Sequence, residues 1–303
     1  MRLHSVGPNG VRPPGERRSP LPNVNMPGDP ENLLTETGGS PLQGPPSQLP
    51  ALALAPHEIW KLRDLLLFVA FIPFALLVSE FVVLIGYVVL RPFTGWHVKV
   101  DLVKSEIVFL LLQQCVFYAF ILVFLFLLAK LQHQPHVWKS LGWKKPTGRQ
   151  VAGYLGGGGG LAIATGLALW LLPDTQGFPL EKLFNSRTDS FALGAFAISI
   201  APVVEELVFR GLLFAVFERA VGLRFAVVTT AVLFAGLHVP EYWHAWHHLF
   251  MILMVGMVFS LARGSTGSLA PSILLHVGYN SLIIISLFFS TQHFRTAIGL
   301  WMP

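Results

Sequence analysis

The chain has 303 residues, of which 53% are hydrophobic and only 12% carry a charge. An ordinary soluble domain has about 25% charged residues, so this composition excludes a soluble globular protein and indicates an integral membrane protein. The net charge of +5 is explained by the orientation of the membrane spans, and it gives no reason to expect a nucleic-acid partner.

Residues 1–56 differ in kind from the rest of the chain. They contain 12 prolines, 7 glycines and no aromatic residue, a composition that cannot bury a hydrophobic core. We therefore predict a disordered, Pro/Gly-rich cytoplasmic tail that ends near His57.

Seven later stretches are apolar over about the length that crosses a bilayer. They are continuously apolar, whereas the strands of a membrane barrel alternate in polarity. The sequence thus predicts an all-α fold, a polytopic transmembrane helical bundle of about seven to eight spans. The stretches are residues 65–90, 107–129, 151–172, 191–217, 225–239, 249–262 and 269–289, with the fifth and sixth short. The eighth span would come from residues 175–187 and would move the C-terminus to the other side.

The positive residues predict the orientation of the bundle, because cytoplasmic loops collect Lys and Arg. With the N-terminus inside, 14 of the 21 Lys and Arg residues fall on the cytoplasmic side and 6 on the other. We expect a multi-pass protein of a bacterial inner (plasma) membrane with a cytoplasmic N-terminus. We divide it into the tail, N-terminal transmembrane helices (57–190), a transmembrane core (191–290) and a short C-terminal tail (291–303).

Three charged residues lie inside the fourth apolar stretch: Glu205, Glu206 and Arg210. A charge near the bilayer centre costs about 2.5 to 3.5 kcal/mol on insertion scales, so these residues need partners, water or a function. Positions four apart share a helical face, and we expect Glu206 and Arg210 to form an ion pair. Glu205 points about 100° away from Glu206, which leaves it without that partner. It is then either a general base in a partly hydrated cavity or a structural carboxylate facing a polar groove.

Two further apolar stretches carry polar residues at four-residue spacing. His238 follows Phe234 in the fifth stretch, and Asn280 follows His276 in the seventh. His276 and Asn280 therefore project from one face, where both can donate hydrogen bonds to a developing oxyanion. By helical rise, these polar residues and Glu205 lie about 10 to 20 Å from the cytoplasmic ends of their helices, with His276 the shallowest. Such depths allow them to share one layer.

Two other segments are interpreted as structural. A cluster of one Glu and three His follows the fifth stretch, and its three aromatic neighbours indicate an interfacial loop more than a surface metal site. Five consecutive glycines at 156–160 lack the Lys and Ser or Thr of a phosphate loop and lie inside a span. Close helix packing explains them better.

Three motifs in separate apolar helices resemble those of the CPBP intramembrane metalloproteases, the group that contains the type II CAAX prenyl endopeptidases and the lysostaphin resistance protein A-like domain. They are Glu205-Glu206-x-x-x-Arg210, Phe234-x-x-x-His238 and His276-x-x-x-Asn280, in that order. The resemblance covers about a third of the chain, residues 191–290, and implies that this part is a CPBP-like catalytic core.

The resemblance implies an intramembrane endopeptidase that hydrolyses peptide bonds of membrane-associated substrates, including CAAX-type, prenylated ones. Its partners would be a peptide or protein substrate and the lipid bilayer. Glu205 would activate the attacking water with the help of His238, and His276 and Asn280 would hold the tetrahedral oxyanion. The Glu and Arg that remain in the first motif would support the site.

The cofactor is left open between zinc and none. One Glu with two His would suit zinc, which would then be held by Glu205, His238 and His276. A glutamate-activated water with His and Asn donors needs no metal, and Asn280 is a poor zinc ligand but a good amide donor. We slightly favour the metal-free mechanism.

Two other functions are weighed against a protease. A proton-coupled transporter would use Glu, His and Arg as a relay, but the spans show no internal repeat. A non-catalytic membrane scaffold of the same fold would need none of the polar motif residues, and all of them are present.

Overall fold

A computed structural model describes residues 60–94, 107–132, 136–172 and 186–294 of the chain. All of them belong to the unit formed by residues 53–303. Some predicted segments lie outside the described residues, so what was predicted for them stays a prediction. They are the disordered N-terminal tail, the last nine residues and most of the proposed eighth span.

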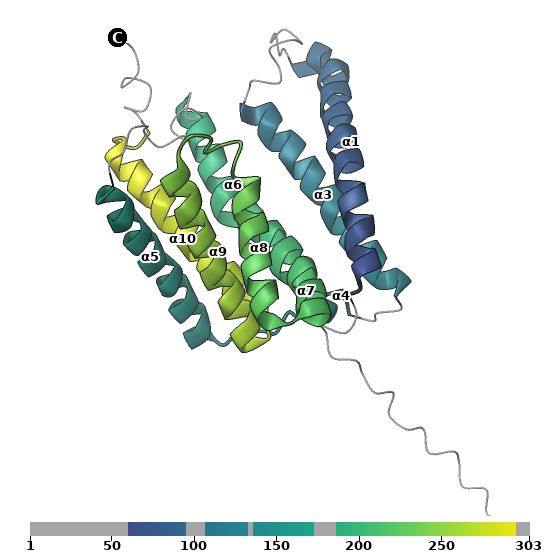
Figure 1. Cartoon of the computed structure of the whole chain (residues 1–303). Coiled ribbons are helices and arrows are strands. Elements are labelled where there is room, and N and C mark those ends of the chain that lie inside the picture. The colour runs from purple at the N-terminus through teal and green to yellow at the C-terminus, as the bar shows by residue number, and fades with distance from the viewer. Residues whose placement is uncertain (1–59, 95–106, 133–135, 173–185, 295–303) are drawn as a thin grey trace, which may run out of the picture. The chain divides into compact units, whose positions relative to one another are not determined.

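The described part of the chain is helical and contains no strand, which confirms the predicted all-α membrane bundle. In chain order the elements are α1 (Leu62–Thr94), α3 (Ile107–Leu131), α4 (Val137–Ser140), α5 (Gly148–Trp170), α6 (Arg187–Glu206), the π-helix η3 (Leu207–Leu213), α7 (Phe214–Val221), α8 (Leu223–Leu237), α9 (Trp246–Thr266) and α10 (Ala270–Ser290) (Figure 1).

Each predicted apolar stretch corresponds to one helical stretch. Among the described residues, six helical stretches are long and apolar enough to cross a membrane, and α8 is a shorter apolar helix. The expectation that the sixth stretch is short was wrong, because α9 has 21 residues and begins at Trp246. It ends where Gly267 takes a left-handed conformation with a φ of 59°, a common helix stop that favours glycine.

The helices α5 and α10 lie side by side and approach closely at two glycines (Figure 1). A Cβ atom on Gly158 would overlap the carbonyl oxygen of Leu275, and one on Gly278 would overlap the carbonyl oxygen of Leu155. Small residues let membrane helices come together in this way. The packing interpretation of the glycine run is therefore confirmed at Gly158.

The π-helix η3 lies in the hydrophobic core. Six of its seven residues are buried, all except Val208. The main hydrophobic cluster gathers buried side chains from α1, α3, η3, α8 and α10. The charged residues Glu205, Glu206 and Arg210, which lie at the end of α6 or within η3, are therefore positioned by tightly packed elements.

Replacing Gly158 with Ala should destabilise the protein, because the new methyl group forces α5 and α10 apart. Overpacking of this kind costs about 1 to 3 kcal/mol. Gly156→Ala is the matched control, since nothing lies within 4 Å of a Cβ at Gly156. Thermal unfolding in detergent should show a lower midpoint for Gly158→Ala and an unchanged or higher one for Gly156→Ala. Equal midpoints for the two variants would contradict the close contact.

Candidate functional site

The two adjacent glutamates lie where α6 passes into η3. Helix α6 ends at Glu206 and η3 covers Leu207–Leu213, whereas one uninterrupted helix was expected from the sequence. Within η3 the carbonyl oxygen of Arg210 accepts a hydrogen bond from Nε of Arg263 on α9, at 3.0 Å. A side chain that bonds a helix carbonyl in this way disturbs the regular ladder. Short π segments inside α-helices are frequent at functional sites.

The predicted ion pair between Glu206 and Arg210 is present and fully buried. Nη1 of Arg210 donates to Oε1 of Glu206 at 2.8 Å, and both side chains are 0% exposed. The other guanidinium nitrogens reach α9, where Nη2 donates to the carbonyl of Gly256 at 2.7 Å and Nε to Oγ of Ser260 at 3.2 Å. Arg210 therefore links η3 to α9 through hydrogen bonds and also neutralises the charge of Glu206.

The ring of Phe234 lies at the centre of the motif residues. The Arg210 guanidinium carbon is 4.8 Å from its centroid, within the range of a cation–π interaction. The rings of His238 and His276 lie 5.0 and 5.7 Å from the same centroid. Phe234 is buried, so it provides an apolar wall that keeps these polar groups in fixed positions.

The imidazole of His276 lies beside both glutamates. Its Nδ1 is 3.0 Å from Oε1 of Glu206, and its Nε2 is 3.9 Å from Oε2 of Glu205. A carboxylate can only accept, so Nδ1 carries the proton in the shorter contact. The depths expected from helical rise allowed these residues to share one layer, and the structure places His276 beside both glutamates.

Glu205 is held differently from Glu206. Its side chain is 21% exposed, and its Oε1 accepts a hydrogen bond of 3.0 Å from the hydroxyl of Tyr118 on α3. The Tyr118 ring stacks on Phe196 of α6, with centroids 5.8 Å apart. Glu205 is thus the accessible carboxylate of the two, oriented by a tyrosine and not by the arginine.

The structure does not bring every predicted site residue into contact with Glu205. His238 follows the last residue of α8, where its Nδ1 is 2.9 Å from the carbonyl oxygen of Phe234. In the described part of the chain no ion pair links His238 to either glutamate. Asn280 uses Nδ2 to donate to the carbonyl of Ala197 on α6 at 2.8 Å, which leaves its second amide hydrogen and its oxygen for other partners.

The family described as type II CAAX prenyl endopeptidase Rce1-like has a model that matches residues 187–282. Residues 187–282, about a third of the chain, are therefore similar to this protease family. No curated protein and no solved structure matches the chain significantly. The Rce1-like match begins with α6 and contains all three motifs, but it leaves α1, α3 and α5 outside.

Tyr118 lies outside the Rce1-like segment and was not among the site residues predicted from the sequence. Its partner is 87 positions away in the chain, so no local spacing relates the two residues. The sequence contains only a general indication of a role for Tyr118. A buried tyrosine hydroxyl in an apolar helix usually has a hydrogen-bond partner, but the pattern does not say which one.

The Rce1-like segment does not bring together the ligands that a metal ion requires. Among the described residues, no group of three or more His, Cys, Asp or Glu side chains is close enough together to hold one ion. Both nitrogens of His276 face the glutamates, and Nδ1 of His238 faces a backbone carbonyl. The side chains as placed do not fit a three-ligand metal centre, so the mechanism below contains no metal step.

Proposed function

We propose that the protein is an intramembrane endopeptidase in which Glu205 is the general base. The observation that supports the proposal is that two neighbouring carboxylates have different surroundings. Glu206 is buried and paired with Arg210, whereas Glu205 is partly exposed and has one oxygen next to His276. A carboxylate that is accessible, oriented and not neutralised is suited to take a proton from water.

In the proposed reaction, Glu205 removes a proton from a water molecule while the water oxygen attacks the carbonyl carbon of the peptide bond. The new C–O bond gives a tetrahedral oxyanion. The C–N bond then breaks, and the proton taken up by Glu205 passes to the leaving amine, so that Glu205 returns to its starting state. The water and substrate occupy the accessible side of the carboxylate.

Donors for the oxyanion come from α10. In this step both nitrogens of His276 carry a proton: Nδ1 donates to Oε1 of Glu206, and Nε2, which is 3.9 Å from Oε2 of Glu205, donates to the oxyanion. Asn280 contributes its second amide hydrogen while the first holds Ala197. His238, at the end of α8, assists Glu205 with the water. Removing one oxyanion donor typically lowers kcat by about 100- to 1000-fold.

The proposed substrates are proteins or peptides associated with the membrane, with CAAX-type, prenylated C-termini as the first class to test. Two facts support this class: the chain has helices long and apolar enough to cross a membrane, and the matching family is named for CAAX prenyl endopeptidases. The proposed location is a bacterial inner membrane, and the bias of Lys and Arg supports a cytoplasmic N-terminus.

Purified protein in detergent should cleave members of a library of membrane-tethered peptides, with and without prenyl groups. Glu205→Gln should reduce the rate by at least about 100-fold, because general-base catalysis contributes about 100- to 10,000-fold. Glu205→Gln should unfold at nearly the wild-type temperature, whereas Glu206→Gln should unfold earlier because it disturbs a buried pair.

Glu80→Gln is the control for this assay, since it neutralises a membrane-helix carboxylate of α1 outside the site. Its cleavage rate should equal that of wild type. The rate should also be unchanged in chelator, and metal analysis of the protein should find no bound zinc. Full activity of Glu205→Gln would contradict the proposed base, and chelator-sensitive activity restored by zinc would contradict the metal-free mechanism.

Tyr118→Phe should lower kcat with little change in KM, because it frees the Glu205 carboxylate to rotate without removing a substrate contact. A hydrogen bond to a charged group contributes about 1.5 to 3 kcal/mol, which corresponds to roughly 10- to 100-fold in rate. Tyr87→Phe is the matched control, as Tyr87 is a buried tyrosine on α1. Equal effects of the two substitutions would rule out an orienting role for Tyr118.

A further inference from the structure

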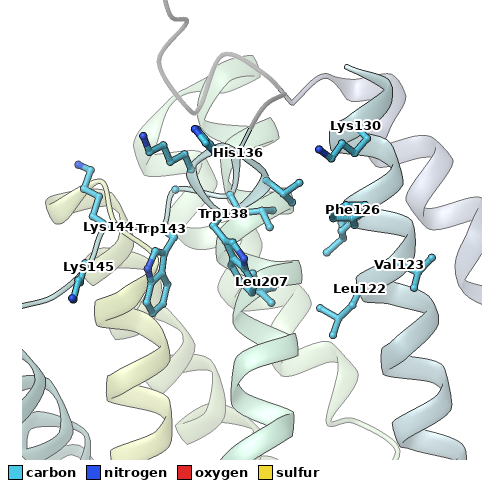
Figure 2. Close-up of a pocket in the computed structure, with 15 residues that line it drawn as sticks. Leu122, Val123, Phe126, Lys130, His136, Trp138, Trp143, Lys144, Lys145 and Leu207 are labelled. Atoms are coloured by element: carbon cyan, nitrogen blue, oxygen red, sulfur yellow. The ribbon is translucent and has the colours of Figure 1, made fainter. Parts of the chain in front are cut away.

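A separate cavity of about 1050 Å³ lies between α3, the segment of residues 136–145 and the first residue of η3 (Figure 2). Its volume is slightly above the range of about 300 to 1,000 Å³ that is usual for small-molecule sites. Of the three motifs only Leu207, an unspecified position of the first motif, lines it; none of the polar motif residues does. The cavity is therefore a distinct feature that the proposed reaction does not use.

The interior of the cavity is apolar. Leu122 and Phe126 line it from α3, Leu141 from the segment after α4, and Leu207 from η3. Leu141 and Leu207 are buried, whereas Leu122 and Phe126 are exposed on the outer face of α3. The apolar wall is thus continuous with a helix surface that faces the hydrocarbon of a bilayer.

The rim of the cavity is basic. Four lysines line it, and no Asp or Glu is among the lining residues. Lys130 lies on one side of the cavity, and Lys144 and Lys145 lie on the other (Figure 2). Lys139 is the fourth lysine of the rim. Nζ of Lys144 also donates to the carbonyl of Thr266 at 3.3 Å, which fixes this side of the rim to the end of α9.

Two tryptophans place the rim at the level of the lipid headgroups. Trp138 and Trp143 line the cavity, are 57% and 36% exposed, and have ring centroids 6.4 Å apart. Exposed tryptophans of membrane proteins gather at the interface between hydrocarbon and water. The lysines beside them therefore face phosphate groups, on the side that the charge bias predicts to be cytoplasmic, where the leaflet is anionic.

We propose that this cavity binds an anionic phospholipid of the cytoplasmic leaflet. The phosphate lies between Lys139, Lys144 and Lys145, and one acyl chain runs along Leu122 and Phe126. Basic pockets between membrane helices on the cytoplasmic side are suited to such headgroups. Charge complementarity selects this occupant, because a neutral lipid or an apolar peptide would leave four lysines without an anionic partner. The proposal does not depend on the protease activity.

Native mass spectrometry of the full-length protein in detergent tests this site, with phosphatidylglycerol and phosphatidylcholine of identical acyl chains as probes. Wild type should bind phosphatidylglycerol about tenfold more tightly or better. The double variant Lys139→Gln/Lys145→Gln should lose roughly 25-fold in affinity, because each lysine near a membrane surface contributes about fivefold. It leaves Lys144 and its contact with α9 in place.

The double variant Arg149→Gln/Arg224→Gln is the matched control, because it removes two exposed cations of the same side that do not line the cavity. It should change the affinity less than about twofold. Leu122→Trp fills the apolar part without changing the charge, and it should also weaken phosphatidylglycerol binding. Folding of the lysine variant is checked by thermal unfolding without added lipid. If that variant does not fold, the effect of Leu122→Trp on phosphatidylglycerol binding tests the site.

Three results would overturn the proposal. The first is equal affinity for the two lipids, and the second is an equal loss in the lysine and arginine variants. The third is displacement of phosphatidylglycerol by an equimolar prenylated peptide, which would show that the cavity is a substrate site.

Discussion

The buried contact between Glu206 and Arg210 determines how the other polar groups of the bundle are arranged. Moving two charges out of water costs several kcal/mol per ion, and their attraction offsets this only with good geometry and further hydrogen bonds. The structure supplies both, through the 2.8 Å contact and through donors and acceptors on α9 and α10. Once Arg210 is fixed in this way it packs over Phe234, and His276 is held against Glu206. Glu205, one residue earlier, is left outside the pair.

The site depends on helices that lie outside the Rce1-like match. The matched segment, residues 187–282, provides the three motifs. Helix α3 provides the hydroxyl that orients Glu205, and α5 packs against α10, which carries His276. Tyr118 fixes one oxygen of Glu205 while the other faces His276. The same helix α3 also lines the lysine-rimmed cavity with Leu122 and Phe126, which follow Tyr118 along the helix at four-residue spacing.

Much of the bundle could be predicted from the sequence, because apolar length and helical spacing are local properties. The apolar stretches, the Glu206–Arg210 pair and the close packing at Gly158 all follow from such patterns. The π-helix could not be predicted, because it involves a side chain of α9 that bonds the carbonyl of Arg210. The depths from helical rise allowed the polar residues to share one layer, and His276 does lie beside both glutamates. The bond from Asn280 to Ala197 joins residues 83 positions apart, and no periodicity encodes it.

The division of roles between the two glutamates is tested most directly by double-mutant cycles with Arg210, read as free energies of unfolding in detergent. The cycle of Glu206→Gln with Arg210→Met should give a coupling energy of about 3 kcal/mol, because either single change leaves a buried charge or polar group without its partner. The cycle of Glu205→Gln with Arg210→Met should give less than about 1 kcal/mol. Equal coupling energies in the two cycles, or a larger one for Glu205, would contradict the claim that Glu206 is paired and Glu205 is free to react.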